Sequence, residues 1–145
     1  MEISKEGIKF LIELEGYKAT MYKDSAGLDT IGVGHLVKIG EVFKQPLSVE
    51  AISKLLEEDL DLVETAVDSL ILIELTQNQF DALCCLVFNI GIGAFTASTV
   101  RKVINRKGSL NEVRGAWLLW KRVGGIVSKG LLSRRFKEIR LYGSY

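Results

Sequence analysis

Residues 15–35 read EGYKATMYKDSAGLDTIGVGH, and this stretch decides the fold. Upstream of it, apolar residues recur at the spacing of one helix face between a candidate N-cap, Ser4, and Glu15. Gly16 is a residue type that commonly follows the end of a helix. Beyond it, Tyr, Thr, Ile and Val are mixed with Asp, Ser and Gly, which is typical of short strands joined by turns. The sequence therefore predicts a short helix ending at Glu15, followed by a small β-hairpin or three-stranded sheet.

The rest of the chain has mainly helical patterns. Thr76 with Gln79, and Ser109 with Glu112, have the spacing of capping boxes, and the segment after Thr76 is apolar almost all round. We expect helices from Ser48 to a kink or end near residue 69, after Thr76, from about 98 to 105, from 109 to about 120 and from 131 to 142. The segment after Thr76 should be the centre of the core.

The length of 145 residues fits a single domain that can bury its own core. We expect an α+β domain over residues 1–145, with a β-lobe over about 16–38 and a larger helical lobe over about 1–15 and 47–145. A cleft between two such lobes is a natural place for a ligand.

The cysteine and histidine content argues against a disulfide and a metal site. Cys84 and Cys85 are neighbours in an apolar segment, where a bridge between them would be strained, so buried free thiols are expected. Zinc sites need Cys and His at set spacings, and the chain has one histidine, His35. We expect no metal and no cofactor.

The N-terminal sequence MEISKEG lacks the basic and apolar regions of a secretory signal, and no window approaches the ~18 consecutive apolar residues of a membrane span. We therefore expect synthesis in a cytoplasm without stable membrane insertion. Any target outside that compartment must then be reached by another route.

Charge is distributed unevenly along the chain. Residues 1–75 carry 7 Lys against 15 acidic residues, whereas residues 76–145 carry 12 Lys and Arg against 3 acidic residues. A basic half indicates either an anionic polymer as partner or simple attraction between the two halves, and the sequence favours neither. Binding of nucleic acid is not expected, because the basic half lacks an interleaved aromatic platform or a recognition-helix pattern.

Two carboxyl groups in the opening stretch match the requirements of glycoside hydrolysis. That reaction needs one protonated carboxylic acid at the leaving oxygen and a second, ionised carboxylate that activates water or attacks the sugar. Glu15 follows apolar neighbours at a helix end, which favours its protonated form, whereas Asp24 lies in a polar turn, which favours its ionised form. The pair alone is weak evidence, because the chain has 18 acidic residues.

The residues around this pair make the pattern specific. The run TIGVGH over residues 30–35 begins with Thr30 and comes after Glu15 and Asp24. Tyr22 and Gly27 also precede that run. This pattern resembles the signature of the phage-type lysozymes, the glycoside hydrolase family of lambdoid and T4-like phage endolysins. The similarity continues with FNIGIGAF over residues 88–95 and Ser98-Thr99, and more loosely with Trp120, Gly124-Gly125, Gly130-Leu131 and Arg134-Arg135. It covers nearly the whole chain.

The resemblance implies a lysozyme-like fold and a role for three residues. Glu15 would be the general acid, Asp24 would activate the attacking water, and Thr30 would help to hold that water. Inversion at the anomeric carbon is similarly implied, which requires roughly 6.5–9.5 Å between the carboxyl groups. A threonine hydroxyl suits this position because it can donate to Asp24 and accept from water.

Other residues of the motif have two interpretations each. Gly32 and Gly34 would leave one face of a strand bare, either for close approach of a sugar or for tight packing on a helix. His35 could be a base, but a lone histidine beside a core strand is more often a hydrogen-bonded or ion-paired structural residue. For substrate contacts the resemblance points to Leu36, Phe88 and Ser98, although an aromatic in an apolar helix is usually a core residue.

The function implied by the resemblance is hydrolysis of the β-1,4 bond between N-acetylmuramic acid and N-acetylglucosamine in bacterial peptidoglycan, for lysis of the host cell. The enzyme, expected to be a monomer, would remain in the host cytoplasm until a holin opens the inner membrane. A rival interpretation is a wall-binding module without turnover, but the presence of Glu15, Asp24 and Thr30 together argues against it.

Overall fold

The computed structural model describes residues 1–144, and Tyr145, the last residue of the predicted helical lobe, lies outside the described residues. The chain divides into two compact units. One unit is Lys9–Leu62, and the other combines Met1–Ile8 with the chain from Val63 onward. The helices α1 (Lys5–Glu15) and α2 (Val49–Leu70) each run from one unit into the other. That the whole chain behaves as one domain stays a prediction.

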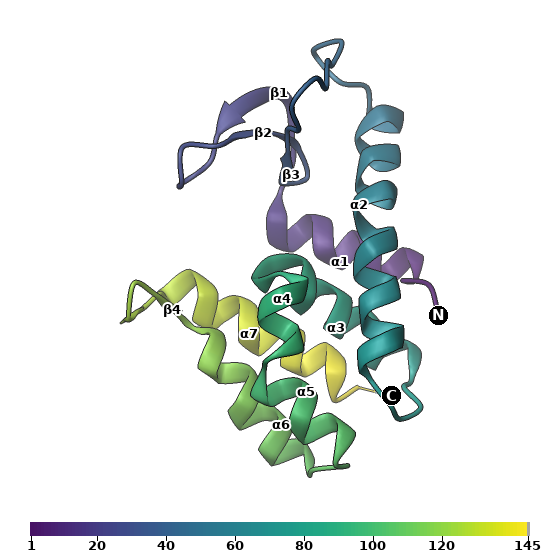
Figure 1. Ribbon diagram of the computed structural model, residues 1–145, viewed down its shortest axis with the longest axis vertical. Coiled ribbons are helices and arrows are strands. Elements are labelled where there is room, and N and C mark those ends of the chain that lie inside the picture. The colour runs from purple at the N-terminus through teal and green to yellow at the C-terminus, as the bar shows by residue number, and fades with distance from the viewer. Residues whose placement is uncertain (145) are drawn as a thin grey trace. The chain divides into compact units, whose positions relative to one another are not determined.

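The unit Lys9–Leu62 contains a three-stranded antiparallel sheet, which in chain order falls between two helical segments (Figure 1). Its strands are β1 (Lys18–Lys23), β2 (Asp29–Gly32) and β3 (His35–Leu36), with β2 in the middle. Ile31 and Val33 are buried, as are Leu55 and Leu56 on the apolar face of α2. The predicted helix ending at Glu15 and the predicted sheet are both confirmed.

The interpretation of Gly32 and Gly34 as a bare strand face is wrong. Only Gly32 belongs to a strand, while Gly34 lies in the two-residue turn between β2 and β3, and both have a φ of +64°. Residues with a side chain rarely adopt this conformation, so the turn requires glycine for its backbone. A Cβ at Gly32 would lie 3.6 Å from Leu55, an ordinary contact that leaves room beside α2.

The other unit is almost entirely helical. After the end of α2 come α3 (Gln77–Ile90), α4 (Ile92–Thr96), α5 (Thr99–Asn105), α6 (Leu110–Trp117), the 3-10 helix η1 (Leu118–Trp120), the short strands β4 (Arg122–Val123) and β5 (Ile126–Val127), and α7 (Lys129–Tyr142). Helix α3 packs against α7, and eight of its residues, from Phe80 to Val87, are buried. The prediction that this segment is the centre of the core is confirmed.

Most helix starts were predictable from their caps. The Thr76 and Ser109 capping boxes are both formed and Ser98 caps α5, whereas α7 begins after its cap Ser128, two residues before the predicted start at 131. Helix α4 and the β4–β5 hairpin were not predicted, because both are short and surrounded by glycine. Cys84 and Cys85 are free and buried, as expected. None of the helices over residues 1–144 is long and apolar enough to cross a membrane.

A buried cluster of charged groups lies on α7. Glu138 is fully buried and accepts hydrogen bonds from Arg134 Nε at 2.8 Å, Arg135 Nη1 at 2.6 Å and Trp117 Nε1 at 2.9 Å. The two arginines also donate to the backbone carbonyls of Cys85 and Trp120. The carboxylate of Glu138 on α7 therefore binds Trp117 of α6 directly. Through the two arginines it is also connected to the backbone of α3 and η1.

Candidate active site

Glu15 is the last residue of α1, and its position follows from how that helix ends. Gly16 has a φ of +67°, and its N–H donates to the carbonyl of Ile12 at 2.7 Å. This left-handed residue stops the helix and turns the chain into β1 two residues later. The side chain of Glu15 is half-buried, so the carboxyl group lies at a helix end next to the first strand of the sheet.

Asp24 lies in the tight turn between β1 and β2. Its Oδ1 accepts hydrogen bonds from the N–H groups of Ala26 at 2.8 Å and Leu28 at 2.9 Å. The turn is closed by the bond from Asp24 N–H to the Leu28 carbonyl, and Gly27 supplies its positive φ of +77°. No described residue donates to Asp24 Oδ2. The carboxylate is therefore held by one oxygen, while the other is available to a water molecule.

Thr30 is buried in β2, and its hydroxyl is oriented by the same turn. Its Oγ1 donates to the carbonyl of Leu28 at 2.9 Å. The expected bond from Thr30 to Asp24 is not formed, because the nearby carbonyl takes the proton. The lone pairs of Oγ1 can still accept a hydrogen bond from water. The backbone of Leu28 thus connects the two side chains, with its N–H on Asp24 and its carbonyl on Thr30.

The three residues predicted to contact substrate fall in different parts of the chain. Leu36 in β3 pairs directly with Thr30 in β2, and its side chain is 51% exposed, so it lies beside the predicted site. Phe88 and Ser98 belong to the other unit, where Phe88 is half-buried in α3. Ser98 is buried and its Oγ accepts from the N–H of Arg101 as the N-cap of α5. Its local role is therefore to cap a helix.

His35 is held by carboxylates on both ring nitrogens. Nδ1 lies 2.8 Å from Asp59 of α2, and Nε2 lies 3.0 Å from Glu41, while the ring is 5% exposed. A neutral imidazole can donate from only one nitrogen, so this arrangement selects the doubly protonated cation. Burial lowers the pKa of His35, but its hydrogen bonds to Glu41 and Asp59 outweigh burial and raise the pKa above its usual value. Neither nitrogen is available to act as a base, which agrees with a structural role.

We expect the stability of the protein to fall as pH rises above neutral because of His35. A histidine whose pKa is raised by folding stabilises the folded state fully below its unfolded pKa of about 6.5, and this contribution is lost as pH rises through the folded pKa. His35→Asn should cost about 2 kcal/mol of unfolding free energy at pH 6 and less at pH 9. Urea unfolding of both proteins across this pH range measures the difference.

The chain offers a clean comparison for this experiment because it contains one histidine. The α-amino group of Met1 also has a raised pKa, through its hydrogen bond to Asp68, but it is common to both proteins. A difference in unfolding free energy that stays constant from pH 6 to pH 9 would contradict the assignment of a charged His35.

Two parts of this region, Asp59 and the backbone of Leu28, were not predicted from the sequence. Asp59 had a signal, because it lies four residues after Leu55 and four before Val63 on the apolar face of α2. An acid at such a position needs a buried polar partner. The role of Leu28 could not be predicted from its residue type, because only its backbone N–H and carbonyl take part in the hydrogen bonds.

The described residues contain no group of three or more His, Cys, Asp or Glu side chains that could hold a metal ion. The chemistry that Glu15, Asp24 and Thr30 can offer is that of two carboxyl groups and a hydroxyl, and a pair of carboxyl groups is what a glycoside hydrolase needs.

Comparisons with known proteins agree with this class. The model of the family described as phage lysozyme matches residues 12–138. The endolysin of Salmonella phage P22 is 43% identical over 98% of both chains, and the crystal structure of a P22 lysozyme mutant superposes with a TM-score of 0.86, at 44% identity over 99% of both chains. The muramidase domain of SpmX from Asticaccaulis excentricus is 32% identical over 99% of both chains, with a TM-score of 0.89. The chain belongs to the phage lysozyme family, and it is a muramidase that degrades peptidoglycan.

Proposed function

We propose that the protein cleaves its glycosidic bond with inversion, using Glu15 as general acid and Asp24 as general base. Glu15 would protonate the oxygen of the leaving sugar, and Asp24 Oδ2 would take a proton from a water molecule that attacks the anomeric carbon from the opposite side. The observation that carries this proposal is the fixing of Asp24 through Oδ1 alone, which leaves Oδ2 for the water.

Thr30 would orient that water. Because its proton is donated to the Leu28 carbonyl, Oγ1 can act only as an acceptor toward a bound water. The water would then donate one proton to Thr30 and the other to Asp24, which directs a lone pair toward the sugar. Leu36, opposite Thr30 in the sheet, would contact the sugar beside this water, and Phe88 and Ser98 would contribute to the remaining substrate contacts.

The proposed biology is lysis of a bacterial host. The enzyme would act as a monomer, be stored in the host cytoplasm and reach the wall after a holin opens the inner membrane. Lysis in cells that express the chain with or without a holin tests this route, because expression alone should leave the cells intact.

The proposed mechanism predicts the configuration of the first product. With a soluble chitooligosaccharide or a muropeptide as substrate, NMR should detect the α-anomer before mutarotation, because a single displacement inverts the β-linkage. Mass spectrometry should detect reducing-end muramic acid, and an anhydro product would mean that no water takes part. Initial formation of the β-anomer would contradict the role of Asp24 as general base.

Asp24→Asn should reduce the initial rate at least about 100-fold, because an amide cannot accept the proton of water. Asp29→Asn is the matched control, since Asp29 begins β2 of the same hairpin but pairs with Lys23 at the surface. The control should retain most of the activity.

A further inference from the structure

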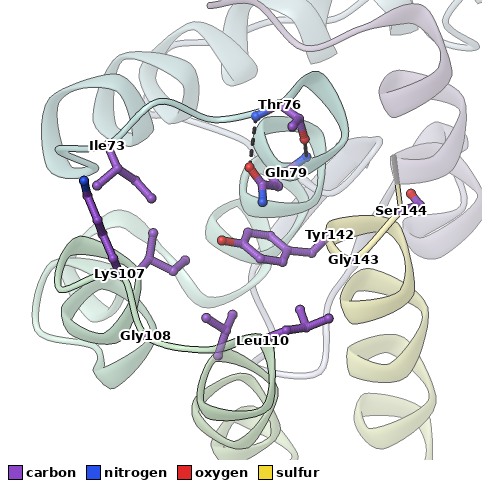
Figure 2. Close-up of a pocket in the computed structure, with 11 residues that line it drawn as sticks. Ile73, Thr76, Gln79, Lys107, Gly108, Leu110, Tyr142, Gly143 and Ser144 are labelled. Atoms are coloured by element: carbon purple, nitrogen blue, oxygen red, sulfur yellow. Dashed lines mark hydrogen bonds between the residues drawn. The ribbon is translucent and has the colours of Figure 1, made fainter.

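A second candidate binding site lies in the helical unit and includes none of the residues proposed for catalysis. It is a pocket of about 280 Å³ between the α2–α3 connection, the end of α5, the start of α6 and the end of α7. Its walls include the apolar side chains of Ile73, Ile104, Leu110 and Val113 (Figure 2). A pocket of this size and lining fits a small ligand with a branched aliphatic body.

Tyr142 places a polar group in this apolar setting. The residue is 94% buried, with 6% of its surface exposed, and its ring packs against Trp117 at a centroid distance of 5.3 Å. Its hydroxyl points into the pocket and forms no hydrogen bond with a described residue (Figure 2). Although most of the ring is buried, the hydroxyl oxygen itself stays accessible from the pocket, so it can donate to a ligand that enters. Burial raises the pKa of Tyr142, which keeps the phenol protonated and able to donate.

Gln79 adds a second donor. Its Oε1 accepts a hydrogen bond from the N–H of Thr76 at 2.9 Å in the capping box of α3. The oxygen of the amide is therefore engaged. The amide Nε2 donates to no residue that the structure describes. In Figure 2 the amide group lies above the Tyr142 hydroxyl, on the same side of the pocket.

Lys107 gives the pocket a positive charge. It has a left-handed backbone, with a φ of +58°, in a turn whose N–H groups donate to Ile104 and Val103. Its ammonium group has no ion pair within residues 1–144, because the nearby Glu112 is engaged by Arg106 at 2.7 Å and by Ser109. No Asp or Glu lines the pocket.

The polar groups of Tyr142 and Gln79 that no described residue uses are thus available on apolar walls, and Lys107 supplies the positive charge of the lining. We propose that this pocket binds a small carboxylate with a branched or methyl-bearing aliphatic body. The carboxylate would accept hydrogen bonds from Tyr142 and Gln79 in the field of Lys107, while the aliphatic body would contact Leu110 and Val113. The ligand could be a free organic acid or the terminal D-alanine of a wall peptide, which share this chemistry.

The test is a titration of the ¹⁵N-labelled full chain with 4-methylpentanoate, followed by NMR. We expect saturable shifts centred on Gln79, Lys107, Leu110 and Tyr142, with a dissociation constant on the order of 1 mM for a ligand with so few atoms. The neutral isostere 4-methylpentanamide should bind at least about fivefold more weakly, because it lacks the charge that Lys107 favours.

Variants separate this site from general surface binding. Tyr142→Phe and Lys107→Met should each weaken 4-methylpentanoate binding at least about fivefold. Lys102→Met is the matched control, because Lys102 is an exposed lysine of α5 that does not line the pocket, and its binding should equal that of the unaltered protein. The comparison of acid with amide and the Lys107 variant keep the test decisive even if Tyr142→Phe unfolds.

Absence of saturable shifts up to about 20 mM, shifts centred elsewhere, or equal binding of the acid and the amide would overturn the proposal. A parallel titration with N-acetyl-D-alanyl-D-alanine distinguishes the two sources. Tighter binding of the dipeptide than of 4-methylpentanoate assigns the pocket to wall peptides, and exclusion of the dipeptide assigns it to free acids. This site does not depend on the proposed catalytic mechanism, so each can fail without the other.

Discussion

Glu15→Gln is expected to abolish clearing of purified peptidoglycan while leaving the fold intact. The glutamine side chain keeps the shape of Glu15 but has no proton of suitable acidity to transfer to the leaving oxygen. General acid catalysis contributes about 10²–10⁴ to a rate, so the initial rate should fall at least about 100-fold. Because Glu15 is half-buried at a helix end, the unfolding free energy should change by no more than about 1 kcal/mol. Turbidity of a peptidoglycan suspension measures the rate.

The matched control for this variant lies on the same helix. Glu13 is exposed, and Glu13→Gln removes the same charge two residues earlier. The activity of Glu13→Gln should stay within about twofold of that of the unaltered protein, because salt screens the charge of an exposed side chain. Near-normal clearing by Glu15→Gln, or an equal loss in Glu13→Gln, would contradict the assignment of Glu15 as the acid.

The positions of Glu15, Asp24 and Thr30 in secondary structure were predictable because the local signals agree. A glycine after Glu15, a polar turn around Asp24 and β-branched residues around Thr30 each act over a few residues, and the structure follows them. The helix caps at Thr76 and Ser109 were predictable for the same reason.

Contacts between residues far apart in the sequence were harder to predict. The sequence predicted that His35 is paired, but not that Asp59 and Glu41 hold it from opposite sides. The partners lie 24 and 6 residues away, and several other acids are as near in the sequence. Backbone groups such as those of Leu28 are invisible to reasoning from residue types, which is why the hydroxyl of Thr30 was assigned the wrong acceptor.

Arg134 and Arg135 illustrate the same limit for the helical unit. In the sequence they count toward the basic half of the chain, whose role was left open, whereas in the structure both are buried and bonded to Glu138. A helix with charged residues three and four apart commonly exposes such pairs. Only the packing of α7 against α3 shows that these charges are part of the core.

Glu138→Gln should therefore be among the most destabilising substitutions in the chain. Glu138 is fully buried and accepts from Arg134, Arg135 and Trp117. Replacing its charge with an amide leaves two guanidinium groups in a low-dielectric core without this counter-charge, and one amide N–H₂ group faces a donor. Breaking one side of a buried ion pair costs about 3–5 kcal/mol, which corresponds to a fall of roughly 10 °C in the midpoint of thermal unfolding.

Glu112→Gln is the control that isolates burial from charge. Glu112 pairs with Arg106 at the surface and closes the capping box of α6, and a glutamine at this position preserves the box. Its cost should be small compared with that of Glu138→Gln, because exposed ion pairs contribute little. Circular dichroism melts and urea unfolding of the two variants measure both values. A loss below about 1 kcal/mol for Glu138→Gln would mean that the arginines reach water or another acceptor when the carboxylate is neutralised, and that the cluster does not hold α7 in place.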